Sequence, residues 1–176
     1  VCQGLYAPGS AFKPAVAAAA LTAGIDPAAT VNCTGRYGFY SGYQPGCLQY
    51  GHGGPGDPRP ALGDSCNIFF YDVGRRLGVD VFSAMARQLG LATPTGVEIT
   101  EAQGRLTWSS DENYQAGPTL MAAIGQGNTA VTPLQLAAYA ATLANFGQRP
   151  ALHFADRAVN AATGETVWQD APTFTT

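Results

Sequence analysis

The chain has 176 residues, which is enough for one domain or for part of a larger protein. Hydrophobic residues make up 46% of it and charged residues only 12%, so the composition predicts a folded core rather than a disordered chain. The net charge of −3 offers no basic field for nucleic acid, and no apolar run is long enough to span a bilayer.

The first predicted helix follows a Pro-Gly turn at residues 8–9. Ser10 is a favoured residue type at a helix N-cap, and Pro14 fits a first helical turn because its missing N–H costs nothing there. The alanine-rich segment 15–23 continues the helix, and Gly24 can end it.

The segment 32–60 is dense in Gly, Pro and Tyr and is predicted to form a long irregular loop. A loop of this length inside a compact domain usually has a function or covers another part of the fold. Cys33 and Cys47 lie in it, and three states are open: a disulfide in an oxidising compartment, two thiols, or a zinc site with His52. The spacing matches no closed zinc pattern well, so no metal ligand is predicted.

Two helices are predicted after this loop. One begins near Ser65, has apolar residues at helical spacing as far as Leu77, and ends at Gly78. The other covers residues 80–89 and is closed by Gly90.

The best-defined helix covers residues 134–145. The Thr-Pro pair at 132–133 supplies an N-cap residue and an N1 proline, and Gly147 follows the helix end. Beyond it, the segment 159–168 is predicted to form a hairpin around a central Thr-Gly pair. The chain is therefore predicted to be mostly helical, with little strand.

The chain contains one lysine, Lys13, and it lies three residues after Ser10; the other eight basic residues are arginines. Residues three apart on a helix share a face, so these two side chains can approach each other. A desolvated lysine can act as a base, whereas arginine cannot be deprotonated in a protein. Ser10 is therefore a candidate nucleophile for acyl transfer and Lys13 its candidate general base.

For Lys13 to act near neutral pH, its pKa must fall by about 3 units from about 10.4. A helix N-terminus disfavours a nearby cation by only about 0.3–1 kcal/mol, so burial must provide most of the shift. Tyr6, Phe12 and Pro14 are expected to help exclude water. Backbone N–H groups beside Ser10 are candidate donors to the oxyanion of an attacked carbonyl.

A second polar element, Ser65-Cys66-Asn67, opens the next strong helix. By itself it predicts ordinary helix capping, since Asp64, Ser65 and Asn67 are all favoured N-cap types. Beside a Ser-x-x-Lys element, Ser65 becomes a candidate proton shuttle and Asn67 a candidate donor to a substrate amide. Nothing near Cys66 marks it as an activated thiolate.

Together these elements resemble the penicillin-binding protein transpeptidases, and specifically the class B enzymes of the elongation type. The resemblance rests on Ser10-x-x-Lys13 and Ser65-x-Asn67. It extends from Tyr6 to about Gly147 through three further stretches, Gly51-His52-Gly53, Ala123-Ile-Gly-Gln-Gly127 and Val131-Thr-Pro-Leu-Gln-Leu-Ala137.

The resemblance implies an α+β fold. Residues 1–176 would form a partial transpeptidase domain, the mainly helical portion of the penicillin-binding protein/β-lactamase-like fold, with much of the central antiparallel sheet missing. The implied activity is that of a D,D-transpeptidase, which cross-links peptidoglycan stem peptides ending in D-Ala-D-Ala and is acylated by β-lactams. No cofactor and no metal is implied.

By the same resemblance, Ser10 is the nucleophile and Lys13 its base, while Ser65 and Asn67 line the substrate site. Residues 125–127 are assigned to tight turn packing rather than to catalysis.

Two features depart from the family pattern. Pro118 stands where an acidic residue is expected, and no Lys-Thr-Gly can occur because Lys13 is the only lysine. In the family that motif forms the other wall of the cleft and supplies the second oxyanion donor. The chain is therefore expected to be a truncated part of a longer parent, anchored on the extracytoplasmic face of the membrane, and to have little activity alone. A degenerate homologue is the alternative.

In the full-length parent, a glycosyltransferase and other cell-wall synthesis proteins are the implied partners. Within the same superfamily, a D,D-carboxypeptidase, a class D β-lactamase and a β-lactam sensor remain alternatives, and the lifetime of the acyl-enzyme distinguishes them. The further alternative is a non-catalytic helical binding module, in which Ser10 is a helix cap and Lys13 a solvated cation.

Overall fold

The structure is a computed structural model that describes residues 1–25, 32–48 and 58–175. The chain divides into two compact units. One, called here the helical unit, consists of Ala7–Gln88 and Arg105–Ala130. The other, the hairpin unit, consists of Val1–Tyr6, Leu89–Gly104 and Val131–Thr176.

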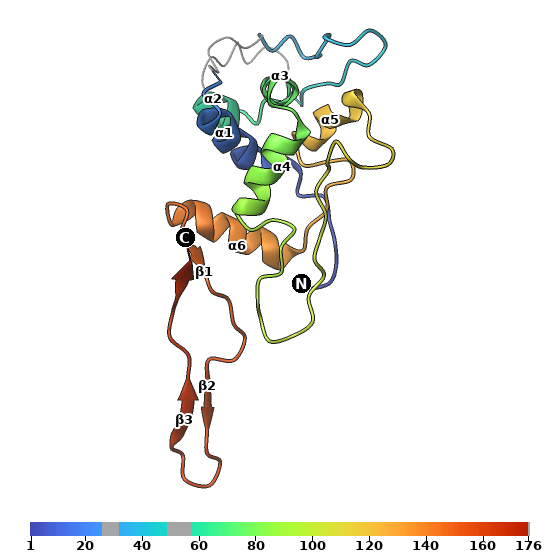
Figure 1. Cartoon of the computed structure of the whole chain (residues 1–176). Helices are drawn as coiled ribbons and strands as arrows, with labels where there is room; N and C mark the ends of the chain where they lie inside the picture. The colour runs from blue at the N-terminus through green and yellow to red at the C-terminus, as the bar shows by residue number, and fades with distance from the viewer. Residues whose placement is uncertain (26–31, 49–57, 176) are drawn as a thin grey trace. The chain divides into compact units, whose positions relative to one another are not determined.

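The helical unit contains one 3₁₀ turn and five α-helices among its described residues (Figure 1). In chain order they are η1 (Gly9–Phe12), α1 (Lys13–Thr22), α2 (Pro58–Gly63), α3 (Asn67–Leu77), α4 (Val79–Gln88) and α5 (Ala116–Ala122). The predictions of α1, α3 and α4 are confirmed to within a few residues, whereas α5 was not predicted. The prediction of a loop as far as residue 60 is wrong at its end, because α2 starts at Pro58, where proline suits a first helical turn.

Small side chains allow α1 to pack against α3 and α4. Ala15, Val16 and Ala19 of α1 are buried, and the Phe12 ring meets the edge of Phe82 at a centroid distance of 6.2 Å. Full burial of one such aromatic side chain contributes about 1.5–3 kcal/mol to folding. This packing holds η1, which carries Ser10, and the start of α1, which carries Lys13.

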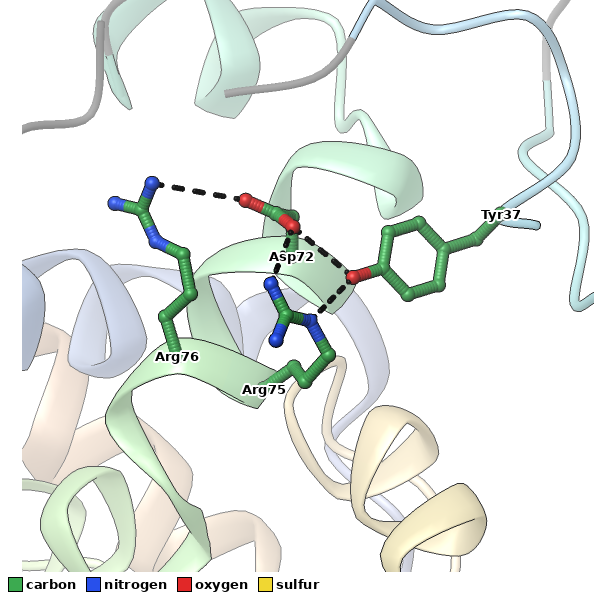
Figure 2. A network of polar contacts seen from close by, with 4 residues as sticks. All are labelled: Tyr37, Asp72, Arg75 and Arg76. Carbon is green, nitrogen blue, oxygen red and sulfur yellow. Dashed lines mark hydrogen bonds and ion pairs between the residues drawn. The ribbon is translucent and has the colours of Figure 1, made fainter. Parts of the chain in front are cut away.

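A polar network anchors the loop formed by residues 32–48 to α3 (Figure 2). The Tyr37 hydroxyl donates to Asp72 Oδ1 at 3.0 Å and accepts from Arg75 Nε at 2.8 Å. Asp72 also forms ion pairs with Arg75 at 3.2 Å and with Arg76 at 3.8 Å. Burial raises the pKa of Tyr37 to about 12, so its phenol keeps the proton that it donates.

The hairpin unit contains one helix and four short strands among its described residues. These are α6 (Pro133–Ala144), β1 (Arg149–Pro150), β2 (Arg157–Val159), β3 (Thr166–Gln169) and β4 (Phe174–Thr175). β1 pairs antiparallel with β4, and β2 with β3, with a register shift between Ala158 and Val159. The predicted hairpin is confirmed (Figure 1). The pairing of β1 with β4 was not predicted, because the two strands are too short to give a pattern.

The start of α6 follows the sequence signals closely. Thr132 Oγ1 accepts from the Gln135 N–H and Gln135 Oε1 accepts from the Thr132 N–H, both at 3.1 Å, which makes a capping box. Gln135 Nε2 also lies 3.0–3.1 Å from the carbonyl oxygens of Thr93, Ala102 and Gln103. The Thr-Pro-Leu-Gln stretch therefore ties the helix start to the segment 93–103.

The expected fold class is confirmed. Helices dominate the described residues, and the strands that they contain are short and antiparallel. No helix in the described part of the chain has the length and apolar character needed to cross a membrane.

Candidate active site

The four polar residues predicted as a site come together in the helical unit. Ser10 and Lys13 lie in η1 and at the start of α1, whereas Ser65 and Asn67 lie at the start of α3. Ser65 Oγ donates to Ser10 Oγ at 3.0 Å, and Lys13 Nζ donates to Ser65 Oγ at 2.9 Å. Ser65 thus bridges the candidate nucleophile and the candidate base.

Among the described residues, Lys13 Nζ meets three hydrogen-bond acceptor atoms, which belong to Ser65 and Asn67. It lies 2.7 Å from the Ser65 carbonyl oxygen, 2.7 Å from Asn67 Oδ1 and 2.9 Å from Ser65 Oγ. The carbonyl and amide oxygens only accept hydrogen bonds, whereas the hydroxyl can also donate. A neutral amine has two N–H groups and one lone pair, so when Lys13 is neutral its lone pair faces the Ser65 hydroxyl.

Burial tunes Lys13 toward this neutral form. The side chain is 1% exposed, and desolvation by burial lowers its pKa from 10.5 to about 8, outweighing smaller electrostatic effects of Cys47 and Cys66 that raise it. The ring of Phe70 covers the amine, with its centroid 5.5 Å from Nζ. The prediction that desolvation provides the shift is confirmed. Tyr6, expected to exclude water, is instead 64% exposed.

Ser10 does not cap a helix, so that prediction is wrong. It lies inside η1, and the residues at the two N-cap positions, Pro8 for η1 and Phe12 for α1, form no side-chain cap. The physical reason is that the Ser10 hydroxyl is exposed and hydrogen-bonded to Ser65 instead.

The start of α3 is also capped by a different residue from those predicted. Cys66 is the N-cap, and its Sγ accepts from the Phe69 N–H at 3.4 Å. The Ser65 hydroxyl and the Asn67 amide oxygen instead accept hydrogen bonds from Lys13. Ser65 adopts a φ of +51°, a left-handed conformation uncommon for residues other than glycine, and both its carbonyl and its hydroxyl meet the same amine.

The 32–48 loop adds contacts that the sequence did not predict. Asn67 Nδ2 donates to the Gly46 carbonyl oxygen at 3.3 Å, and the Asn67 backbone N–H donates to Cys47 Sγ at 3.4 Å. The Tyr71 hydroxyl donates to the same Gly46 oxygen at 3.5 Å. Of the loop residues in this group, Cys47 was singled out from the sequence, together with Cys33, as a candidate for a disulfide, a thiol or a zinc ligand.

Three thiols gather beside this site. The Sγ atoms of Cys33, Cys47 and Cys66 all lie within 4.8 Å of one another. No disulfide joins any of the chain's four cysteines, all of which the structure describes. Burial raises the pKa of Cys66 to about 12, which agrees with the prediction that it is not an activated thiolate. His52, the other zinc ligand considered from the sequence, lies outside the described residues.

A close backbone approach holds the turn that carries Ser10. The Gly9 N–H donates to the Gly125 carbonyl oxygen at 3.0 Å. Gly125 has a φ of +70°, and a Cβ there would overlap the Gly9 carbonyl oxygen and Phe12 Cβ. The assignment of this glycine to turn packing is confirmed.

Two of the features singled out from the sequence are placed as follows. Residues 51–53 lie outside the described part of the chain, and Pro118 lies within α5. The sequence contains no second lysine for a Lys-Thr-Gly element. The chain therefore brings together the Ser10-x-x-Lys13 and Ser65-x-Asn67 elements, and it contains no Lys-Thr-Gly element.

Comparison with known proteins identifies the family of the chain. The family model of the penicillin binding protein transpeptidase domain matches residues 1–174. The chain is 32% identical, over 181 residues, to the peptidoglycan D,D-transpeptidase MrdA of Salmonella typhimurium, a match that covers 95% of the chain and 28% of that relative.

Solved structures give the same result. The ceftriaxone acyl-enzyme complex of penicillin-binding protein A from M. tuberculosis matches with a TM-score of 0.79 and 27% identity, covering 98% of this chain and 39% of that one. A peptidoglycan synthase complex, described as coordinating polymerization and crosslinking, matches with a TM-score of 0.77 and 36% identity, covering 86% of this chain and 27% of that one. The chain thus spans well under half of the proteins that it matches, and over nearly its whole length it belongs to the penicillin-binding protein transpeptidase domain family.

Proposed function

We propose that this chain supplies the nucleophile side of a serine D,D-transpeptidase that cross-links peptidoglycan stem peptides. The observation that carries the proposal is the continuous hydrogen-bonded path from Ser10 Oγ through Ser65 Oγ to Lys13 Nζ. Serine is a weak nucleophile unless a base takes its proton, and this path connects it to the only lysine of the chain.

Acylation begins when Ser10 Oγ attacks the penultimate D-Ala carbonyl of a stem peptide ending in D-Ala-D-Ala. The Ser10 proton passes to Ser65 Oγ as Ser65 gives its own proton to the neutral amine of Lys13. The released D-Ala takes a proton back along the same path. An amine of a second stem peptide then attacks the Ser10 ester carbonyl and gives up a proton, which passes to Ser10 Oγ as the ester C–O bond breaks. This step forms the cross-link and frees the serine.

Asn67 is proposed to orient the substrate. Its Oδ1 is held by Lys13, and one of its two Nδ2 hydrogens is used by Gly46. The second hydrogen is left to donate to an amide carbonyl of the stem peptide. Ser65 and Asn67 thus act in both proton transfer and substrate binding.

The same serine is proposed as the target of β-lactams. The acyl-enzyme complex of the similar penicillin-binding protein A with ceftriaxone supports this proposal. The similar synthase complex joins polymerization to crosslinking, so a glycosyltransferase is the proposed partner. Because the substrate is peptidoglycan, the site is proposed to lie on the extracytoplasmic face of the membrane.

The test is acylation by a fluorescent penicillin, followed in the longest polypeptide that carries this chain together with a Lys-Thr-Gly segment. We expect covalent labelling that disappears in Ser10→Ala and persists in Ser41→Ala, because Ser41 is an exposed serine of the 32–48 loop. Equal labelling of Ser10→Ala would refute the nucleophile.

Two further outcomes decide between classes of function. Loss of the label within seconds would indicate a hydrolase of the same superfamily, and absence of labelling in the long polypeptide would indicate a non-catalytic module. The 176-residue chain alone is expected to label poorly, because it has no Lys-Thr-Gly element to complete the oxyanion site.

A further inference from the structure

The two strand pairs of the hairpin unit are separated by a break in the strands. β1 pairs with β4 and β2 with β3, and residues 151–156 and 170–173 connect the two pairs. Every residue of β2 and β3 is exposed, and these strands form a two-stranded ribbon (Figure 1). A two-stranded hairpin is only marginally stable in water, so the contacts at its base determine how firmly it is held.

The side chain of His153 crosses this break. Its Nε2 lies 3.3 Å from Asp170 Oδ2, and its Nδ1 lies 2.9 Å from the carbonyl oxygen of Ala155. The Asp170 N–H in turn donates to the carbonyl oxygen of Asp156 at 3.0 Å. His153 therefore connects the chain that enters β2 to the chain that leaves β3.

The two ring contacts of His153 fit only the protonated side chain. A carboxylate oxygen and a carbonyl oxygen are both acceptors, so each ring nitrogen must donate. A neutral imidazole carries one N–H, and its other nitrogen is an acceptor. Neutral His153 can therefore keep the hydrogen bond to Ala155 or the one to Asp170, whereas the imidazolium keeps both.

Glu98 holds the same junction from the Leu89–Gly104 segment. Its Oε2 accepts from the Phe154 N–H at 2.9 Å, and its Oε1 accepts from the Ala155 N–H at 3.2 Å. The hydrogen bond from Phe154 lowers the pKa of Glu98, so this carboxylate keeps its charge where histidine titrates. A fixed negative charge therefore lies beside the residue that changes its charge.

The surroundings of the ring favour its protonated form. The hydrogen bond to the Ala155 carbonyl oxygen and the carboxylates of Asp170, Glu98 and Asp156 raise the pKa of His153 above its usual 6.5. Because this pKa is raised in the folded state, the contacts contribute their full stability below about pH 6.5. That contribution is lost as the pH rises through the raised value.

We propose that Glu98, His153 and Asp170 form a pH-dependent clamp at the base of the β2–β3 hairpin, which closes when the imidazole is protonated. Deprotonation breaks one of the two ring contacts and in either case removes the charge attraction to Asp170. Glu98 still holds the chain that enters β2, but the chain that leaves β3 is released from it. The hairpin is therefore fixed in mildly acidic solution and loosened in mildly alkaline solution.

Histidine titration by nuclear magnetic resonance tests the clamp in the 176-residue chain. The chain has two histidines, so ¹³C labelling at Cε1 gives two signals, and His153→Gln identifies one of them. We expect the His153 midpoint to lie above 6.5 and to fall in Asp170→Asn and in Glu98→Gln. Glu165→Gln is the matched control, because it removes an exposed carboxylate of the same hairpin that does not contact His153.

Two results of this titration would overturn the clamp. One is a His153 midpoint at or below 6.5 in the unmodified chain. The other is the same midpoint in Asp170→Asn as in Glu165→Gln.

The response of the hairpin is measured in the unmodified chain from backbone carbon chemical shifts, which report strand content. Residues 157–159 and 166–169 should have strand-like shifts at about pH 5.5 and lose part of them at about pH 8, the range in which histidine changes its charge. The shifts of α6 should be the same at both values, and His153→Gln should make the hairpin shifts independent of pH. Hairpin shifts that are equal at the two values in the unmodified chain would refute the switch.

Discussion

Lys13 and Ser65 meet at two points: the buried amine of Lys13 lies 2.7 Å from the carbonyl oxygen of Ser65 and 2.9 Å from its hydroxyl oxygen. The carbonyl contact fixes the position of the amine, and the hydroxyl contact can carry a proton in either direction. Ser65 makes this double contact with its backbone in the left-handed region, at a φ of +51°.

Removal of the Ser65 hydroxyl should interrupt proton transfer while leaving Ser10 in place. Positioned acid–base groups contribute about 10²–10⁴-fold to a rate, so Ser65→Ala should lower the rate constant of penicillin acylation by that order. Stopped-flow labelling of the long polypeptide measures it, with Ser41→Ala as the control. A Ser65→Ala rate within twofold of the unmodified protein would show that Lys13 reaches Ser10 without the relay.

The acylation rate should rise with pH through about pH 8. The base is the neutral amine, and with a pKa of about 8 its fraction grows from about one tenth at pH 7 to about nine tenths at pH 9. The profile of acylation rate from pH 6 to 9.5 measures this, with circular dichroism at each pH to confirm that the protein remains folded. A flat profile would contradict the role of Lys13 as base.

A methyl group at Gly125 should disrupt the nucleophile turn. Gly125→Ala forces a Cβ onto the Gly9 carbonyl oxygen and Phe12 Cβ at a φ of +70°. Gly127 is the matched control, since its φ is +71° but a Cβ there meets nothing within 4 Å. We expect Gly127→Ala to cost about 1–2 kcal/mol from its backbone alone, and Gly125→Ala clearly more.

Denaturant unfolding of the two glycine variants measures this difference. Equal destabilisation would mean that the close approach of Gly125 to Gly9 has no energetic consequence.

The amide of Gln135 should stabilise the hairpin unit through its N–H groups. Gln135→Glu keeps an oxygen for the capping box but removes the donors to the carbonyl oxygens of Thr93, Ala102 and Gln103. Buried acceptors left without a donor cost about 1–3 kcal/mol, and the buried carboxylate adds to that cost. Urea unfolding should show this loss for Gln135→Glu and almost none for Gln148→Glu, where the side chain is exposed.

Local signals predicted the elements that local interactions specify. The limits of α6 could be predicted from three residues, Thr132, Pro133 and Gly147. Thr132 and Pro133 mark its start through capping and an N-terminal proline, and Gly147 follows its end with a positive φ. Such signals are local, because they involve residues only a few positions apart. The pattern of apolar residues predicted α3 for the same reason. Helix α2 was missed since its prolines also occur in loops, and only the structure shows that Pro58 begins a helical turn.

Composition and spacing alone identify Ser10 and Lys13 as a candidate nucleophile–base pair, because the single lysine lies one turn from a serine. They also show that the Lys-Thr-Gly element is absent. Only the fold shows that Ser65 Oγ contacts both Ser10 Oγ and Lys13 Nζ, and that Gly46 and Cys47 contact Asn67. It alone brought Cys33, Cys47 and Cys66 together. These contacts join residues far apart in the chain, and sequence spacing carries no information about them because packing between α1, α3 and the 32–48 loop sets the distances.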